Sequence, residues 1–598
     1  MTEHDMDISA RPPRIAPWLA GPMRENRPIY LRIALAALFT NLFALASSIF
    51  TMVVYDRVLP NDATDSLIAL SIGIGIIILF DIALKLLRGY FTDFAGARVD
   101  RQIGTSVFRQ LIAIRFGSRR GSTGAQVGLM RELETLRDFF ASATVTALVD
   151  VPFALITLML IFVIGGPVVL VPMVIIPLVI LSGWLLQPVL SRLSAAAMKD
   201  GLGKQTVLVE TIGGLETVKA SGAAPMLEQR WDRALQDHAG ISLRQRLVSN
   251  LAVTLAQAGQ IMSYVGVVIV GVRLVGEGEL SLGGLLACSI LAGRAVAPLT
   301  QLTQLLSRLT STRVAYAQID RLMQQENEET QDRRLAPPSL RGEIELRDVS
   351  FSYPGGAKAL DDVSFHISPG EKVAIIGRVG SGKSTIARLL LGLYEPESGV
   401  VMVDGSELRQ FEPDVLRRRI GSALQETVLF SGTVRDNITL GREDIDDEEM
   451  LRAARLSGTD EFMSVLPNGY ERRLADRGEG LSGGQKQSIA LARALAGRPD
   501  VLLLDEPSSH MDTQGEAMLL DRLEGELKDR TLIVITHRTP FLQLVDRLIV
   551  VDRGRIVGDG PRDEVLARMR GPQGAAQGAS KQGQVTTSTA AIRDGNAS

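Results

Sequence analysis

Residues 372–385 read KVAIIGRVGSGKST, and residues 386–394, IARLLLGLY, follow directly. The stretch begins as a short apolar strand and ends with the apolar spacing of a helix. Between them stands the pattern G-x-x-x-x-G-K-S, whose glycines let backbone N–H groups curve around phosphate oxygens. In this strand–loop–helix setting the pattern predicts a nucleotide-phosphate site at the positive end of a helix.

The residue types in this loop suit a nucleoside triphosphate with Mg²⁺. Lys383 is expected to reach the β- and γ-phosphates, and Ser384 is expected to ligand Mg²⁺. The residues predicted to bind the nucleotide here are Gly377, Gly380, Gly382, Lys383, Ser384 and Thr385.

A second apolar strand lies downstream, at residues 501–506, and reads VLLLDE. A buried strand that ends in two carboxylates suits metal-assisted hydrolysis. Asp505 can hold the Mg²⁺ shell, and Glu506 can polarise the attacking water. The pattern is weak alone, and it gains force because it follows the phosphate loop.

Residues 481–485, Leu-Ser-Gly-Gly-Gln, stand directly before a helical pattern, KQSIALARALAG. By this motif the sequence is identified as a member of the ABC ATPases. The resemblance implies that two such domains bind head to tail, with each ATP between the phosphate loop of one chain and this motif of the other. It implies the further nucleotide ligands Ser482, Gly483, Gly484 and Gln485. A chain with one membrane domain and one ATPase domain is therefore expected to work as a homodimer.

Other residues match the same family one by one. The resemblance implies that Tyr353 in FSYPGG stacks on adenine, and that Gln425 in ALQETVLFSGTVRDNI senses Mg²⁺. It implies that residues 509–512 cross between the two ATPase domains, and that His537 contacts the γ-phosphate. A lone histidine is more often a core residue, but His537 follows a second apolar strand, TLIVIT. The expected catalytic residues are Glu506, His537 and Gln425, the expected metal ligands are Ser384, Gln425 and Asp505, and the expected cofactors are ATP and Mg²⁺.

The first half of the chain is apolar in a different way. Six runs are each close to the ~20 residues that cross a ~30 Å hydrocarbon core. They cover about 30–54, 66–87, 143–164, 167–190, 250–275 and 281–303. The long connections at 88–142 and 191–249 are helical in pattern and rich in Arg and Lys, which places them on the cytoplasmic side. The short loops between the other runs are expected to face outward.

These patterns divide the chain into five parts. We expect a cytoplasmic arm (1–29), a transmembrane domain with six helices (30–325), a linker (326–342), an α/β nucleotide-binding domain (343–568) and a disordered tail (569–598). The predicted fold class is an all-α membrane domain of the ABC type I exporter fold joined to an α/β P-loop ATPase domain. The start of the chain is charged and no apolar region adjoins it, so we expect no cleavable signal peptide.

The bulk composition excludes several classes of function. The net charge of -3 gives no reason to expect a nucleic-acid partner. Cys288 is the single cysteine, so an intrachain disulfide and a cysteine metal site are both ruled out. The expected location is the bacterial inner membrane, with the chain crossing the bilayer several times and the ATPase domain in the cytoplasm.

The membrane half resembles one branch of the family, the type I secretion exporters. The resemblance is carried by residues 40–67, which contain YDRVLPN, by residues 87–100 and 209–223, and by RGEGLSGGQ at 477–485. It implies ATP-driven export of a polypeptide, such as an RTX-like protein, a protease or an adhesin, together with a periplasmic membrane-fusion adaptor and an outer-membrane channel. At most 29 residues precede the first apolar run, so we expect no peptidase-like domain there.

Two other functions remain open at this stage. An exporter of lipids or small molecules shares the architecture, and a non-transporting ABC ATPase with a membrane anchor would share the ATP site. Within the apolar runs, Asp81 and Lys85 have the spacing of an i,i+4 pair. Arg294 is expected to face the bundle interior or a water-filled cavity, where it either lines the transport path or pairs with a carboxylate such as Asp150.

Overall fold

The structure, a computed structural model, describes residues 16–118, 122–139, 144–328 and 335–569. Contacts within the chain group it into two compact units. The first unit holds the chain up to Gln325 except for residues 115–118, and the second holds residues 115–118 and the chain from Glu326 on. The predicted tail beyond residue 569 and the first half of the predicted arm lie outside the described residues.

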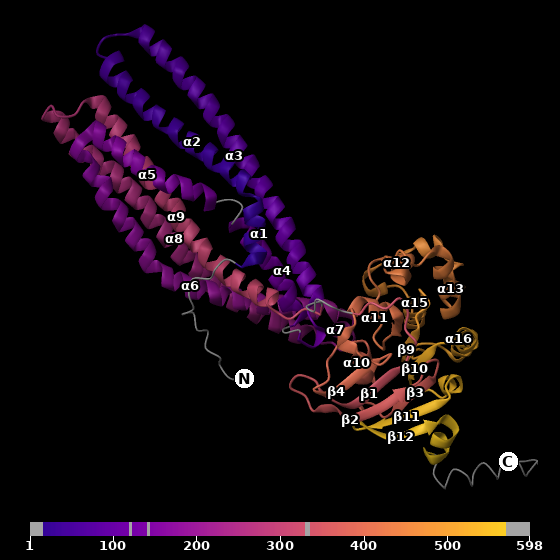
Figure 1. The fold of residues 1–598 in the computed structure, drawn as a ribbon. Coiled ribbons are helices and arrows are strands. Elements are labelled where there is room, and N and C mark those ends of the chain that lie inside the picture. The colour runs from indigo at the N-terminus through magenta and orange to yellow at the C-terminus, as the bar shows by residue number, and fades with distance from the viewer. Residues whose placement is uncertain (1–15, 119–121, 140–143, 329–334, 570–598) are drawn as a thin grey trace, which may run out of the picture. The chain divides into compact units, whose positions relative to one another are not determined.

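Helices form the first unit, and the longest of them run side by side (Figure 1). They are α1 (Pro17–Glu25), α2 (Arg27–Val53), α3 (Thr64–Ala113), α4 (Thr123–Asp138), α5 (Thr144–Gly165), α6 (Leu170–Gly213), α7 (Leu215–Ala220), α8 (Ala224–Gly276) and α9 (Leu282–Met323). At a rise of ~1.5 Å per residue a helix as long as α3 or α8 extends for more than twice the ~30 Å of a hydrocarbon core. These helices therefore continue well beyond one face of a membrane.

In the described part of the chain, five helical stretches are long and apolar enough to cross a membrane. One of them, Val149–Gly213, contains most of α5 and all of α6, which are joined through Gly165 and Gly166. The six predicted apolar runs consequently fall on α2, α3, α5, α6, α8 and α9. Large apolar side chains on these helices are exposed, among them Leu79 (68%) on α3 and Trp184 (69%) on α6. Such exposed apolar surface suits contact with lipid.

Polar side chains attach α2 to its neighbours within the apolar segments. Asn41 donates from Nδ2 to Asp150 Oδ1 of α5 at 2.6 Å. Arg294 of α9 donates to the carbonyl oxygen of Ala44 and, at 3.0 Å, to Ser47 Oγ. Of the two roles left open for Arg294, pairing with a carboxylate is not seen for Asp150, because each of these two charged groups bonds to a different part of α2.

The predicted i,i+4 pair on α3 is present. Lys85 Nζ lies 2.7 Å from Asp81 Oδ2. The pair lies within the apolar run and joins two side chains one turn apart on α3.

The segment after α2 is fastened to the start of α9. A short π-helical segment, Val54–Val58, follows α2 directly. Within it, the Asp56 carboxylate accepts hydrogen bonds from Ser281 Oγ at 2.6 Å and from the Gly283 N–H at 2.8 Å. Ser281 is itself the N-cap of α9 and accepts from the Gly284 N–H. Asp56 therefore places a negative charge at the positive end of α9, which gives the YDRVLPN segment a structural role.

The second unit contains two main sheets (Figure 1). The larger has the order β12-β11-β3-β10-β9-β6, in which only β12 is antiparallel to its neighbour, and the smaller is an antiparallel sheet of order β2-β1-β4-β5. The strands are β1 (Ile344–Ser352), β2 (Lys358–Ile367), β3 (Lys372–Gly377), β4 (Ser398–Val403), β5 (Ser406–Glu407), β6 (Ile420–Ala423), β7 (Gly432–Thr433), β8 (Arg473–Leu474), β9 (Val501–Asp505), β10 (Thr531–Ile535), β11 (Arg547–Asp552) and β12 (Arg555–Pro561). Strands β7 and β8 pair separately.

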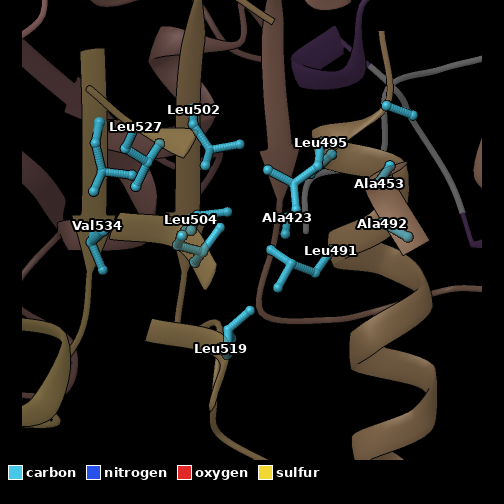
Figure 2. Packing of buried hydrophobic residues seen from close by; sticks show 14 of the residues in the cluster. Ala423, Ala453, Leu491, Ala492, Leu495, Leu502, Leu504, Leu519, Leu527 and Val534 are labelled. Carbon is cyan, nitrogen blue, oxygen red and sulfur yellow. The ribbon is translucent and has the colours of Figure 1, made fainter. Parts of the chain in front are cut away.

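The larger sheet is buried on both faces. Successive side chains of a strand point to opposite sides, so each strand contributes to two cores. Leu502 and Leu504 of β9 belong to one core, and Leu503 belongs to the other. On the first face the side chains of α15 pack against the strands, as Figure 2 shows for Leu491 and Leu495 near Ala423. The helices of this unit are α10 (Lys383–Leu390), α11 (Pro413–Arg419), α12 (Val434–Thr439), α13 (Asp447–Ser457), α14 (Thr459–Met463), α15 (Gly483–Leu495) and α16 (Thr513–Glu526).

Residues 115–118 connect α3 to α4 in the sequence and belong to the second unit. Arg115 Nη1 lies 3.0 Å from Glu395 Oε1, and the ring of Phe116 meets the ring of Tyr394 edge-on with centroids 5.5 Å apart. This segment lies within the range 30–325 that was predicted for the transmembrane domain, and nothing in the sequence indicates these contacts.

The Asp56 contact gives a stability prediction. Asp56→Ala should lower the free energy of unfolding by about 0.5–2 kcal/mol, the range found when a helix loses its cap, because the start of α9 loses two hydrogen bonds. Asp56→Asn keeps the shape and one acceptor oxygen and should recover most of the loss. Thermal unfolding of the purified protein measures both, and an unchanged midpoint for Asp56→Ala would contradict the assignment.

Candidate functional site

The phosphate loop joins the end of β3 to the start of α10, as predicted. Gly380 and Gly382 have φ angles of 78° and 104°, which L side chains rarely adopt. A Cβ on Gly382 would also lie 2.6 Å from the carbonyl oxygen of Ala359. The loop thus requires glycine at position 382 for both conformation and space.

Lys383 is the first residue of α10 and reaches back over the loop. Its Nζ donates to the carbonyl oxygens of Gly377 at 2.8 Å and Arg378 at 2.9 Å. Burial lowers the pKa of Lys383, and the carboxylates of Glu506 and Asp505 oppose this shift. An anionic phosphate at the loop would favour the charged ammonium.

Two further groups in the loop region suit a phosphate with a divalent cation. The Ser381 hydroxyl is buried without a hydrogen-bond partner within the described ranges. The Ser384 hydroxyl lowers the pKa of Asp505, the last residue of β9, so the two side chains lie on the same side of the site. Burial raises the pKa of Asp505, Glu506 adds to the rise, and Ser384 and Lys383 oppose it. A divalent cation would favour the charged carboxylate, so this donor set fits Mg²⁺.

Gln425 lies on the same edge of the sheet. It follows β6 by two residues, and β6 pairs in parallel with β9 so that Ala423 is opposite Leu504. Its side chain is exposed. The structure therefore places Ser384 where it influences Asp505 and leaves Gln425 near the end of the neighbouring strand.

Glu506 and His537 come together from adjacent strands. His537 Nδ1 lies 2.6 Å from Glu506 Oε1. The Glu506 N–H donates to the Ile535 carbonyl at 2.8 Å, and its backbone has a φ of 53°, which is rare for a residue other than glycine. In the described part of the chain Glu506 Oε2 is buried without a partner. One carboxylate oxygen is thus fixed by the histidine, and the other is available to accept a proton.

The Leu-Ser-Gly-Gly-Gln motif begins α15 with a capping box. Ser482 Oγ accepts from the Gln485 N–H at 3.2 Å, and the Ser482 N–H donates to Gln485 Oε1 at 2.9 Å. Gln485 therefore holds the helix start. Within the described ranges, no hydrogen bond connects residues 481–485 to the phosphate loop at 377–385. A single chain presents these two halves of the predicted site separately.

Tyr353 has contacts that the sequence did not indicate. Its hydroxyl lies 3.1 Å from Thr385 Oγ1 and accepts from Arg388 Nη1 at 2.9 Å. Its ring meets Phe351 and Tyr394 edge-on. Tyr353 thus bonds to two residues of α10, the helix that follows the phosphate loop. Its stacking on adenine stays a prediction.

Two residues that the sequence analysis did not single out support this site. Gln487 of α15 donates to the carbonyl oxygen of Glu506, and Arg538 Nη2 donates to the carbonyl oxygen of Ser509 at 3.1 Å. The sequence does carry a signal for Gln487, because it is an amide one residue before the apolar run IALARAL of α15, separated from it by Ser488. The residues next to Arg538 in the sequence do not predict its bond to Ser509.

Known families match both parts of the chain. The model described as "ABC transporter" matches residues 360–509, and the model described as "ABC transporter transmembrane region" matches residues 30–298.

Similar proteins cover most of the chain. The toxin RTX-I translocation ATP-binding protein of Actinobacillus pleuropneumoniae is 33% identical over 563 residues, which is 93% of this chain and 78% of that protein. The leukotoxin translocation ATP-binding protein LktB of Mannheimia haemolytica is 33% identical over 561 residues, with the same shares covered.

A solved structure has the same fold. It is that of a bacterial Atm1-family ABC exporter with ATP bound, with a TM-score of 0.82, 23% identity, and coverage of 94% of this chain and 99% of the other. The predicted fold class, a helical membrane domain joined to a P-loop ATPase domain, is confirmed.

The geometry of Glu506 gives a prediction about chemistry. Glu506→Gln should keep ATP binding and lower hydrolysis by about 10²–10⁴-fold, the usual contribution of a positioned general base, because Oε2 can no longer take a proton from water. Nucleotide binding and ATPase rate of the purified protein measure the two effects. Glu524→Gln, on the exposed side of α16, is the matched control, and near-normal turnover of Glu506→Gln would remove Glu506 from this role.

Proposed function

The chain belongs to the ABC transporter family, and from this premise we propose that two copies of it export a polypeptide across the inner membrane. The similarity that carries the cargo assignment is the 33% identity to a toxin translocation protein over 93% of this chain.

Family membership fixes the general activity. The chain is an ATP-driven transporter, and it crosses the inner membrane several times with its ATPase domain in the cytoplasm. The finer question concerns what is transported and with which partners.

The hydrolytic step follows from the residues at the sheet edge. Lys383 and the loop N–H groups would hold the phosphates, and Ser384, Asp505 and Gln425 would hold Mg²⁺. Mg²⁺, when bound, would neutralise charge on the β- and γ-phosphate oxygens. Glu506 Oε2 would take the proton of the attacking water. His537, whose Nδ1 lies 2.6 Å from Oε1, would orient this carboxylate and contact the γ-phosphate.

The proposal needs two chains because one chain does not assemble the whole site. Ser482 and the glycine N–H groups after it lie at the start of α15, where the helix favours an anion. We propose that they contact the γ-phosphate of the nucleotide on the partner. Since Glu506, His537 and Gln425 are all present, both sites of a homodimer would hydrolyse ATP.

Polypeptide cargo implies further partners. A periplasmic adaptor and an outer-membrane channel would complete the route out of the cell, as the resemblance to type I exporters implies. The resemblance is densest at residues 40–67, which include the Asp56 contact to α9. Arg294 of α9 is bonded to Ala44 and Ser47 of α2. Its part in the transport path stays a proposal.

Export of lipids or small molecules is the second candidate. The Atm1-family structure shows that this fold is shared beyond the toxin translocators, so the fold does not distinguish the cargo. The two candidates differ in what is lost when transport stops.

The cargo can be identified by comparing secreted proteins. A host strain with Lys383→Ala should lose one or a few polypeptides from the medium while protein levels of the transporter stay normal, because binding of the phosphates fails. Mass spectrometry of the medium measures this, and Lys528→Ala, at an exposed position in the turn after α16, is the matched control. An unchanged set of secreted proteins, with an ATPase stimulated by lipids or apolar drugs, would favour the second candidate.

The shared site predicts complementation between two inactive chains. Lys383→Ala and Ser482→Arg should each abolish the ATPase of the homodimer, while their mixture should regain activity because one composite site per heterodimer is intact. The ATPase rate of co-expressed, doubly tagged dimers measures this. Activity no higher than that of either variant alone would contradict a site shared between chains.

A further inference from the structure

Gln487 is a buried polar residue in the first half of α15. It is 8% exposed, and its side chain makes three hydrogen bonds to the segment that follows β9. Nε2 donates to the carbonyl oxygen of Glu506 at 2.7 Å and to Ser509 Oγ at 3.2 Å, and Oε1 accepts from the His510 N–H at 3.0 Å. A side-chain amide has an NH₂ group that donates and an oxygen that accepts. In Gln487 both the NH₂ group and the oxygen bond to residues 506–510.

The carbonyl that Gln487 binds belongs to a strained residue. Glu506 has a φ of 53°, and residues in such conformations persist when the surroundings hold them. On one side its N–H donates to Ile535 of β10. On the other side its carbonyl accepts from Gln487. These two bonds, from a strand and from a helix, fix the peptide planes that set the direction of the carboxylate.

The glycines at the start of α15 lie against the same segment. A Cβ on Gly483 would come within 3.2 Å of the His510 ring, and one on Gly484 would lie 3.0 Å from the His510 carbonyl oxygen. Such distances are shorter than ordinary van der Waals contact between carbon atoms. The first turn of α15 and residue 510 are therefore packed without free space, independently of the amide bonds of Gln487.

We infer that Gln487 is a positioning residue, which sets the carboxylate of Glu506 by fastening the backbone of residues 506–510 to the helix that begins at Ser482. The inference rests on the proposed function in one respect, the contact of Ser482 with the nucleotide of the partner. Given that contact, α15 meets one nucleotide at its first turn and holds the catalytic backbone of its own chain one turn later.

Kinetics of the purified full-length protein test this role. Gln487→Met keeps the length and fits a helix but has no N–H donor, and Gln487→Glu keeps the acceptor and places a carboxylate against the Glu506 carbonyl. Both should lower kcat by about 10- to 100-fold, since a misplacement on the order of 1 Å can reduce a rate by about 10²-fold. The KM for ATP should change little, because no phosphate ligand is removed.

Controls separate positioning from loss of folding. Ser488→Ala changes the next residue, which is equally buried at 8%, and should leave kcat near its normal value. Thermal unfolding is measured for every variant, and if Gln487→Met is not folded, Gln487→Glu carries the test. A folded variant with a normal kcat would overturn the inference, whether or not its KM for ATP rises.

A double substitution tests whether the effect passes through Glu506. In a Glu506→Gln background the backbone carbonyl remains and the base is absent, so Gln487→Met should lower the residual rate by less than about 3-fold, as expected for residues that act as a unit. A full 10- to 100-fold loss in this background would show that Gln487 acts on something else and would overturn the inference.

The mixed dimers locate the effect on one chain. In the pair that combines Lys383→Ala with Ser482→Arg, the working site uses Glu506 of the Ser482→Arg chain. Gln487→Met placed on that chain should lower the rate more than the same substitution on the Lys383→Ala chain, and the reverse order would overturn the inference. If the pair itself has no activity, the shared site of the proposed function fails, while the kcat measurements on homodimers still decide the role of Gln487.

Discussion

The parallel pairing of β3, β10 and β9 is the constraint on which the site depends. Ile535 of β10 is opposite both Ile375 of β3 and Asp505 of β9, so the three strands end at one level of the sheet. The residues after each strand then meet without long connections: the phosphate loop after β3, Glu506 after β9 and His537 after β10. Since each strand is buried on both faces by large aliphatic side chains, a shift by one residue would put the wrong set of side chains into each core. The register of the core therefore fixes the chemistry at its edge.

Much of this could be predicted from the sequence because its signals are local. A phosphate loop needs glycines at fixed positions within a few residues, and the capping box that begins α15 lies within Ser482 to Gln485. Apolar runs of sufficient length predict membrane helices in the same way. Both kinds of signal depend on neighbouring residues, so a single sequence contains them.

The contacts that the sequence did not predict join residues far apart in the chain. Asp56 binds Ser281 and Gly283 across 225 and 227 residues, and Arg294 binds Ala44 and Ser47 across 250 and 247. One of the two expectations for Arg294, pairing with a carboxylate such as Asp150, assumed that opposite charges in an apolar region bind each other. The structure instead gives Asp150 an amide and gives Arg294 a carbonyl and a hydroxyl, all from α2. Either solution satisfies a buried charge, and only the packing of the helices decides between them.

Arg294 in the membrane unit and Gln487 in the ATPase unit act on the backbone in the same manner. Each is a polar side chain of a long or well-packed helix, and each donates to a main-chain carbonyl oxygen of another element. A buried donor that loses its acceptor retains its full desolvation penalty, so such a contact specifies one position of the two elements more sharply than apolar packing, which tolerates small displacements. The need for such precision differs between the two places. At Glu506 the backbone holds a φ of 53°, which sets the direction of a buried carboxylate. At α2 the helix lies among apolar side chains that could slide past one another, and the bonds from α5 and α9 give it one register. In both units, therefore, the elements whose exact placement matters are fastened by polar groups, and apolar packing supplies the bulk of the stability around them.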